Sequence, residues 1–214
     1  MNKRFGDLEL KALQAQMNPH FIFNALTAVQ SFILNKDTHA ANSYLTKFST
    51  LMRQSLESSR RKFISLQDEM DMLNNYIALE QVRFGDKFDF ECVVGANVDV
   101  GTEIPSMLLQ PFIENAINHG ILYKEGRGHL TLTFLKDNEA LQCIIDDNGV
   151  GRKEAARRQA LSLQPHISRA TQIMQERVVM LQELEDVRVR ILIIDKIDEQ
   201  KNNSGTKVVI TIAE

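Results

Sequence analysis

The stretch "LQAQMNPHFIFNAL", residues 13–26, places a proline directly before a histidine in a region whose pattern is otherwise helical. The apolar residues around it recur at alternating spacings of three and four, which is typical of a helix that packs along a seam against partner helices. Pro19 has no backbone N–H and disfavours helical angles at Asn18, so we expect a kink or wide turn just before His20. His20 lies about 100° of rotation off the seam, which predicts a solvent-facing, reactive imidazole. The seam consists of Phe5, Leu8, Ala12, Ala15, Pro19, Ile22, Leu26, Val29 and Ile33.

Two further helices are predicted in the first 84 residues. The turn at residues 35–38 precedes a helix that Thr38 can cap, and Ser65 with Asp68 resembles a capping box that opens the next helix. Antiparallel helices with such a long seam cannot bury it alone, so a homodimer that forms a four-helix bundle is favoured over a monomeric three-helix domain. The expected inward residues are Ala41, Leu45, Phe48, Met52 and Leu56 in the second helix, and Leu66, Met70, Leu73 and Ile77 in the third.

The pattern changes near residues 84–86, which predicts a helical domain over residues 1–84 and a second domain over residues 85–214. A helix is expected from about Ser106 to His119, with Gly120 as a typical C-terminal residue. Helical patterns alternate with strand-like segments, so we predict an α/β sandwich: one mixed sheet with helices stacked on one face. The strands are expected at residues 87–94, 129–137, 187–195 and 207–212 and in the segment that begins at residue 140, and a long helix at residues 168–184.

The composition excludes several classes of function. A net charge of -3 on 214 residues gives no general attraction for nucleic acid or anionic lipid, so neither is an expected partner. Cys92 and Cys143 lie in apolar runs without metal-ligand spacing, which indicates free thiols in a reducing compartment. Because the chain has no long apolar run and no export signal, we expect it neither to span a membrane nor to be exported. The first helix begins near residue 5 without a leading loop, so we expect the cytoplasmic end of a larger protein, with a membrane connection only through an upstream segment.

The segment "PFIENAINHG", residues 111–120, has the pattern of an amphipathic helix that carries Glu114, Asn115 and Asn118. Asn115 lies in the apolar flank, where its amide oxygen is a suitable ligand for a Mg²⁺ ion shared with phosphate groups. For this segment alone, an asparagine that bonds to backbone groups in the core is an equally good interpretation.

A second polar segment is "DDNGVG", residues 146–151. Asp147 ends an apolar strand, and Gly149 and Gly151 allow the backbone to turn sharply and approach a ligand closely. A carboxylate beside such a turn can accept a hydrogen bond from the exocyclic amine of adenine, although an aspartate–glycine pair after a strand is often only a turn. The two segments together favour a nucleotide site, and neither a Walker A loop nor a Rossmann glycine motif is present.

Three segments resemble motifs of one family, in the order in which that family carries them. "LQAQMNPHFIFNAL" resembles the phosphoacceptor box of the LytS/YehU-type sensor histidine kinases, "LLQPFIENAINHG" resembles their asparagine box, and "DDNGVG" resembles the first glycine box of the GHKL (Bergerat) ATP-binding fold. The resemblance extends from about Leu10 to Ile212. It implies a dimeric helical-hairpin domain followed by a GHKL domain that uses ATP and Mg²⁺.

The resemblance also implies a role for each matched residue. His20 is the phosphoacceptor, which hands the phosphoryl group to an aspartate in the receiver domain of a response regulator. From the chemistry of the imidazole rather than from the resemblance, we expect the carboxylate of Glu114 to orient His20 or take its proton. Asn24 positions a water that hydrolyses the partner's phospho-aspartate, although an asparagine without function is nearly as good an interpretation. Asn115 is the Mg²⁺ ligand and Asp147 reads adenine. The residues implied at the nucleotide site are Asn115, Asn118, Asp147, Gly149, Gly151 and Thr206.

The expected lid of the nucleotide site departs from the family. Relatives carry a glycine-rich G-x-G-L motif before the long helix, where this chain has residues 168–171, "SRAT". Side chains at these positions restrict positive φ angles, so slow autophosphorylation is predicted. The preceding run "RKEAARRQ" is expected to be a solvated helix face, with Arg152, Lys153 or Arg157 as alternative phosphate contacts. The alternative functions are a pseudokinase that acts as a dimeric interaction module and a GHKL ATPase that clamps two subunits.

Overall fold

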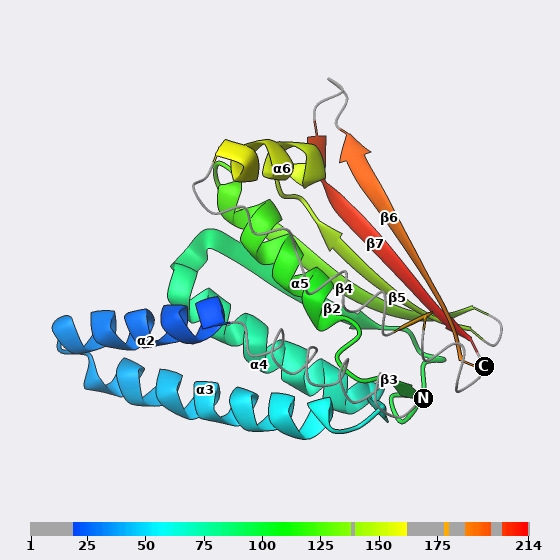
Figure 1. The fold of residues 1–214 in the computed structure, drawn as a ribbon, viewed down its shortest axis with the longest axis horizontal. Coiled ribbons are helices and arrows are strands. Elements are labelled where there is room, and N and C mark those ends of the chain that lie inside the picture. The colour runs from blue at the N-terminus through cyan, green and yellow to red at the C-terminus, as the bar shows by residue number, and fades with distance from the viewer. Residues whose placement is uncertain (1–18, 138–139, 162–177, 180–186, 198–202, 214) are drawn as a thin grey trace. The chain divides into compact units, whose positions relative to one another are not determined.

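The computed structural model describes residues 19–137, 140–161, 178–179, 187–197 and 203–213 (Figure 1). These residues form two compact units. The helical unit contains the chain up to Gly85 together with Gly101–Met107, and the α/β unit contains Asp86–Val100 and the chain from Leu108 onward. The boundary between domains at residues 84 and 85 remains a prediction. No sequence pattern indicated that residues 101–107 group with the helices.

The helical unit contains α2 (Pro19–Leu34), α3 (Thr38–Ser59) and α4 (Leu66–Phe84), which ends at the short turn η1 (Gly85–Lys87). A two-stranded antiparallel sheet joins β1 (Phe63–Ser65) to β3 (Glu103–Pro105). No helix in the described part of the chain is both long and apolar enough to cross a membrane.

The two helix caps differ in how well the sequence predicted them. Ser65 caps α4 as predicted, because its side chain accepts a hydrogen bond from the Asp68 amide at 3.1 Å. The prediction that Thr38 caps α3 was wrong. The cap is Asp37, whose carboxylate accepts from the Ala40 amide at 2.9 Å, because an acceptor one residue earlier reaches the third amide of the helix.

The buried face of α3 is rotated relative to the predicted stripe. Leu45 and Leu56 are each 39% exposed, whereas Tyr44 and Leu51 are buried. The helix contacts both α2 and α4, so its buried face is set by two neighbours rather than by one seam. The buried apolar residues of the unit include Ala25, Val29, Ala41, Tyr44, Leu51, Ile64, Leu66, Met72, Leu73, Tyr76, Ile77, Leu79 and Ile104.

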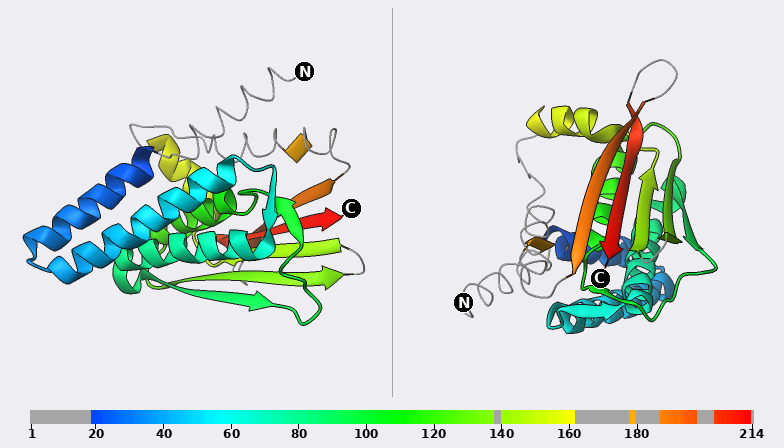
Figure 2. Two further views of the ribbon diagram at one scale, coloured as in Figure 1. Left: turned by 90° about the horizontal axis from the view of Figure 1, so that it is seen from below. Right: turned by 90° about the vertical axis from the view of Figure 1, so that its right-hand side faces the viewer.

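The α/β unit is built on a five-stranded mixed sheet of order β2–β4–β5–β7–β6 (Figures 1 and 2). The first pair, β2 and β4, is parallel, and the other three pairs are antiparallel. All five predicted strands are present, within a few residues of their expected ends. They are β2 (Phe88–Val94), β4 (Gly128–Asp137), β5 (Ala140–Asp147), β6 (Arg188–Ile197) and β7 (Asn203–Ala213).

Helices lie against one face of this sheet, as predicted for an α/β sandwich (Figure 1). They are α5 (Gln110–Asn115), the π-helical turn η2 (Ala116–Gly120), the 3-10 turn η3 (Ile121–Tyr123) and α6 (Gly151–Leu161). Alternate residues of the strands are buried beneath them, and the opposite face is half-exposed. The buried residues are Leu130, Leu132 and Phe134 on β4, Leu141, Cys143, Ile145 and Asp147 on β5, and Val208, Ile210 and Ile212 on β7.

The helix expected at residues 106–119 begins later and ends differently. It starts at Gln110, because Met107 has a left-handed φ of 57°, which a right-handed helix cannot include. Gly120 does not have the left-handed geometry of a typical helix end, because its φ is -95°. The long helix expected at residues 168–184 falls almost entirely outside the described residues.

Candidate functional site

A cavity of about 300 Å³ lies between the helices and the sheet of the α/β unit. All of its described lining residues belong to this unit. Its walls are mostly apolar, with a few convergent polar groups, as in typical small-molecule sites. The lining residues are Phe112, Asn115, Ala116, His119, Gly120, Ile145, Asp147, Gly151, Arg152, Ala155, Ala156, Ile193, Thr206 and Val208.

Asp147 is the most deeply buried charged group of the cavity. It ends β5, is 3% exposed, and accepts a hydrogen bond from the Gly149 amide at 2.8 Å. Burial raises its pKa from 3.8 to about 6, although backbone hydrogen bonds from Gly149 and Thr206 and the charge of Lys196 act in the opposite direction. The ammonium of Lys196 donates to the Asp147 carbonyl oxygen at 3.1 Å and also pairs with Asp146.

Gly149 is required by a close approach between two segments of the site. A Cβ atom at this position would lie 2.3 Å from the carbonyl carbon of Gly120, at the end of η2. The Val150 amide donates to the Gly120 carbonyl oxygen at 3.1 Å and fastens the turn there. Gly151 follows with a φ of 74°, a left-handed angle that favours glycine, and begins α6. The glycine turn therefore fits against the asparagine-bearing helix.

Asn115 and His119 line the cavity from the same side, one helical turn apart. The other two polar residues of this segment, Glu114 and Asn118, are not among its lining residues. Glu114 accepts a hydrogen bond from the Gln110 amide group at 2.9 Å. Of the six residues implied at the nucleotide site, the structure brings Asn115, Asp147, Gly151 and Thr206 to the cavity wall, and Gly149 shapes the turn behind it.

The implied phosphoacceptor lies in the other unit. His20 is the second residue of the described part of α2, but its side chain lies outside the described residues, as does the kink expected before it. Asn24 is half-buried, one turn further along α2. The lid segment, residues 168–171, is also outside the described residues.

The sequence did not single out α6 as a wall of the cavity. Arg152, Ala155 and Ala156 all face it, so Arg152 is not part of a fully solvated helix face. The Arg152 guanidinium donates from Nε and Nη2 to the two carboxylate oxygens of Asp195 on β6, at 2.7 and 2.9 Å. This pair lowers the pKa of Asp195 and raises that of Arg152, mainly through the hydrogen bonds. The two residues are far apart in sequence, so no local pattern signals the pair.

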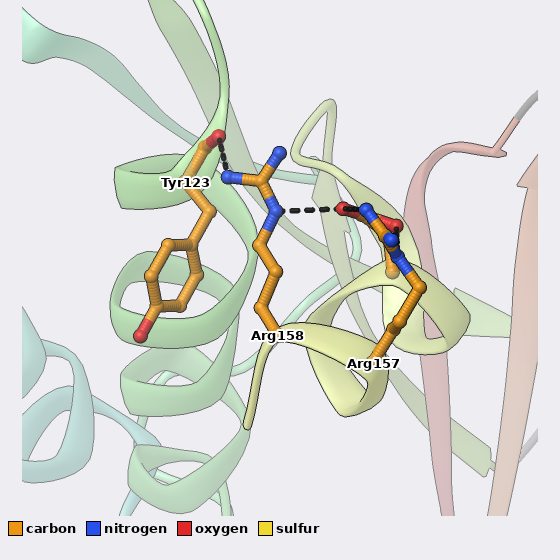
Figure 3. Close-up of polar contacts among 4 residues, drawn as sticks. Tyr123, Arg157 and Arg158 are labelled. Carbon is orange, nitrogen blue, oxygen red and sulfur yellow. Dashed lines mark hydrogen bonds and ion pairs between the residues drawn. The ribbon is translucent and has the colours of Figure 1, made fainter. Parts of the chain in front are cut away.

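Two arginines near the end of α6 share one carboxylate (Figure 3). Glu154 accepts from Arg157 at 2.8 and 2.9 Å and from Arg158 at 2.7 Å. Arg158 also donates to the Tyr123 carbonyl oxygen at 3.1 Å, which connects α6 to η3 (Figure 3). The pairs of Arg157 stay within the helix, whereas Arg158 reaches a neighbouring element.

Comparison with known proteins identifies the class of protein to which this chain belongs. Residues 8–88 match the histidine kinase family. The chain is 39% identical to the sensor histidine kinase YpdA of Escherichia coli over 144 residues, which is 67% of this chain and 25% of that protein. It is 35% identical to the sensor protein LytS of Bacillus subtilis over 150 residues, 70% of this chain and 25% of that protein.

A solved structure is also similar over most of its length. It is the histidine kinase domain of a blue-light activated kinase from Erythrobacter litoralis, with 13% identity and a TM-score of 0.46 over 97% of this chain and 95% of that one. The chain spans about a quarter of the length of the two sensor proteins described above. Within the histidine kinases, it belongs to the LytS-type sensor histidine kinases.

Proposed function

We propose that this chain is the kinase portion of a two-component sensor, which binds ATP in the cavity of the α/β unit and transfers its γ-phosphoryl group to His20. A response regulator then receives the group on an aspartate of its receiver domain. The observation that carries the proposal is Asp147, a carboxyl group 3% exposed at one end of an apolar cavity that Asn115 and Thr206 also line. One relative is named as a sensor histidine kinase and the other as a sensor protein, and residues 8–88 match the histidine kinase family, so neither the pseudokinase nor the clamp ATPase is favoured.

The cavity fits a purine base. Apolar side chains of Phe112, Ile145 and Val208 suit the faces of the ring system, and the buried carboxylate of Asp147 suits its exocyclic amine. A hydrogen bond from the amine favours the ionised form of Asp147 and offsets the cost of its burial. A purine therefore complements both the shape and the charge of this site.

Asn115 would hold Mg²⁺ at the phosphate end through its amide oxygen, and the ion would neutralise charge on the phosphate oxygens. Among the described residues, no cluster of three or more His, Cys, Asp or Glu side chains could hold a metal ion. The magnesium proposal therefore rests on Asn115, with phosphate and water oxygens as the remaining ligands.

The transfer itself depends on positioning and on the protonation of His20. Only a neutral imidazole has a lone pair for in-line attack on phosphorus. Glu114 is proposed to orient the ring or take its proton, and Asn24 to position a hydrolytic water. Asn118 and Gly149 are proposed to support the nucleotide from behind the cavity wall.

A homodimer through the helical unit completes the proposal. Phe23 is 68% and Leu26 55% exposed on α2, and Leu45 and Leu56 of α3 are also exposed. A second copy that covers these side chains would form the four-helix bundle expected from the sequence. By its resemblance to LytS-type sensors, the chain would work in the cytoplasm of a bacterium, as part of a membrane-bound protein.

Labelling with γ-labelled ATP tests the function directly. His20→Gln should abolish acid-labile self-phosphorylation and leave ATP binding intact, because the described residues that line the cavity all belong to the α/β unit. Asp147→Asn should weaken ATP binding by about 1.5–3 kcal/mol, the contribution of a charged hydrogen bond. His129→Gln, at an exposed position on β4, is the matched control and should label normally. Label that survives on the His20 variant would contradict the assignment.

A further inference from the structure

The helix α6 covers one side of the cavity but has little apolar surface with which to hold itself there. Of its described side chains, only Ala155 and Ala156 are apolar, and both line the cavity. A methyl group contributes only about 0.8 kcal/mol when it is buried. Hydrophobic burial therefore contributes little to holding α6 in place, and most of the stabilisation has to come from polar contacts.

Two arginines make these contacts with neighbouring elements. Arg152 bonds to both carboxylate oxygens of Asp195 on β6, and Arg158 bonds to the Tyr123 carbonyl oxygen on η3. The first contact is bidentate, which gives it a defined geometry as well as charge attraction. It joins the first turn of α6 to β6, whose Ile193 also lines the cavity.

The strand register places Asp195 on the sheet face that carries the cavity, although Asp195 itself is not one of its described lining residues. Asp195 on β6 is opposite Thr206 on β7, and Thr206 is opposite Asp147 on β5. The three residues therefore form one row across the sheet, on the face that the helices cover. Ile193, two residues away on the same face of β6, lines the cavity. The Arg152–Asp195 pair thus bridges the edge of the cavity between α6 and β6.

We propose that Arg152 and Asp195 are positioning residues of the nucleotide site: their ion pair holds α6 against β6 as a wall of the base pocket, and its opening sets how fast nucleotide leaves. This inference rests on the proposed ATP site. The side chains of Arg152 and Asp195 are 52% and 29% exposed, so the pair is screened and weak enough to open. The pair holds the part of the site next to the base and does not contact the phosphates. Its loss should therefore change the affinities for adenosine, ADP and ATP by the same factor.

The alternative role of Arg152 predicts a different pattern. If Arg152 left Asp195 to bind phosphate groups, its loss would weaken ATP and ADP but not adenosine. Removing Asp195 would then free the guanidinium and strengthen ATP binding. The two roles therefore give opposite signs for the Asp195 variant.

The experiment uses the full chain and compares Arg152→Ala, Asp195→Ala, the double variant, and the exchanged pair Arg152→Asp with Asp195→Arg. Arg157→Ala is the matched control, because its ion pair stays within α6. Calorimetry gives the affinities for adenosine, ADP and ATP, and stopped-flow release of a fluorescent ADP analogue gives the dissociation rate. Thermal unfolding without nucleotide checks the fold of each variant.

Each single variant should release ADP about fivefold faster and weaken all three ligands by the same factor, since about 1 kcal/mol corresponds to a factor of that size. The double variant should match the singles, the exchanged pair should recover most of the loss, and Arg157→Ala should resemble the parent. Unchanged release rates, losses confined to ADP and ATP, or a gain in ATP affinity for Asp195→Ala would overturn the inference while leaving the ATP site in place. A parent chain that binds no adenine ligand would overturn the proposed function as well.

Discussion

The Asp147 carboxyl group combines a cost to stability with a use in binding. Its burial at the end of β5 raises its pKa to about 6, so at neutral pH the α/β unit carries a buried charge that the unfolded chain would expose to water. A hydrogen bond from a ligand amine to this carboxylate offsets part of that cost in stability. Such a conflict between stability and binding is common at functional sites.

Asp147→Asn should therefore stabilise the ligand-free protein at neutral pH. Because the folded pKa is raised from 3.8 to about 6, the folded state holds its proton more tightly, and the parent loses stability as pH rises through that window. The variant should be more stable by about 3 kcal/mol above pH 6, from a shift of about two units, and equal to the parent below pH 4. Denaturant titrations at several pH values measure this.

The matched control for this measurement is Asp89→Asn on β2, since that carboxyl group is half-exposed and no burial cost is removed with it. It should show no such gain in stability at neutral pH. A variant at 147 that is less stable than the parent at pH 7 would show that the carboxylate's hydrogen bonds outweigh its burial.

Tyr44 in the helical unit is a second buried polar group. Its hydroxyl has no hydrogen-bond partner among the described residues, and its pKa is raised to about 12, first by burial and then by the nearby Glu80. Tyr44→Phe should raise the free energy of unfolding by about 1 kcal/mol, because an unsatisfied buried hydroxyl is removed. Tyr123→Phe, at an exposed ring, should be neutral in the same thermal melts. A loss of stability in the Tyr44 variant would reveal a partner for its hydroxyl outside the described residues.

Among the helices and strands, the sequence predicted the positions of the strands more accurately than the ends of the helices. β2, β4 and β5 alternate apolar and polar residues, and β6 and β7 contain short apolar runs; both are local signals that survive in the fold. β3 has only three residues, and its pairing with β1 depends on a segment about forty positions earlier in the chain, as its register shows. No local pattern predicts such a pairing. None predicts the left-handed angle at Met107 either, so the start of α5 was placed too early.

The exposed face of α2 gives a prediction about assembly. Leu26→Glu should convert a dimer to a monomer, because a charge would then lie in the seam of the proposed four-helix bundle. Ser31→Glu is the matched control, since Ser31 is exposed on the same helix but off the apolar face. Light scattering after size-exclusion chromatography measures the mass. A Leu26 variant that stays dimeric would place the interface elsewhere.

At the scale of the whole molecule, the two units should respond to different perturbations. ATP at a hundred times its dissociation constant should stabilise the transition of the α/β unit by about 2.7 kcal/mol and leave the helical transition unchanged, because the cavity lies within one unit. Scanning calorimetry with and without nucleotide checks this. A shift of both transitions together would mean that the units unfold as one.

Arg83→Ala should destabilise the helical unit and leave the α/β unit unchanged. Glu80 is buried on α4 and its carboxylate accepts from Arg83 at 3.1 and 3.2 Å, so loss of the arginine leaves a buried acid without its partner. The helical transition should fall by about 3 kcal/mol, and the ATP-dependent transition should not move. Arg53→Ala, at an exposed position on α3, is the control.

The sequence by itself determined the classes of element and the chemistry that they carry. Periodicity predicted three helices followed by a mixed sheet, and the segments around Asn115 and Asp147 predicted a nucleotide site. These signals are local, because a helix face or a strand face is encoded by residues a few positions apart. Only the tertiary structure decided which residues meet. Pairing of β5 with β7, and of β7 with β6, brings Asp147, Thr206 and Asp195 into one row, and α6 then carries Arg152 across to Asp195. Such contacts join segments that are distant in the chain, and the burial that shifts the pKa of Asp147 exists only once those segments have packed together.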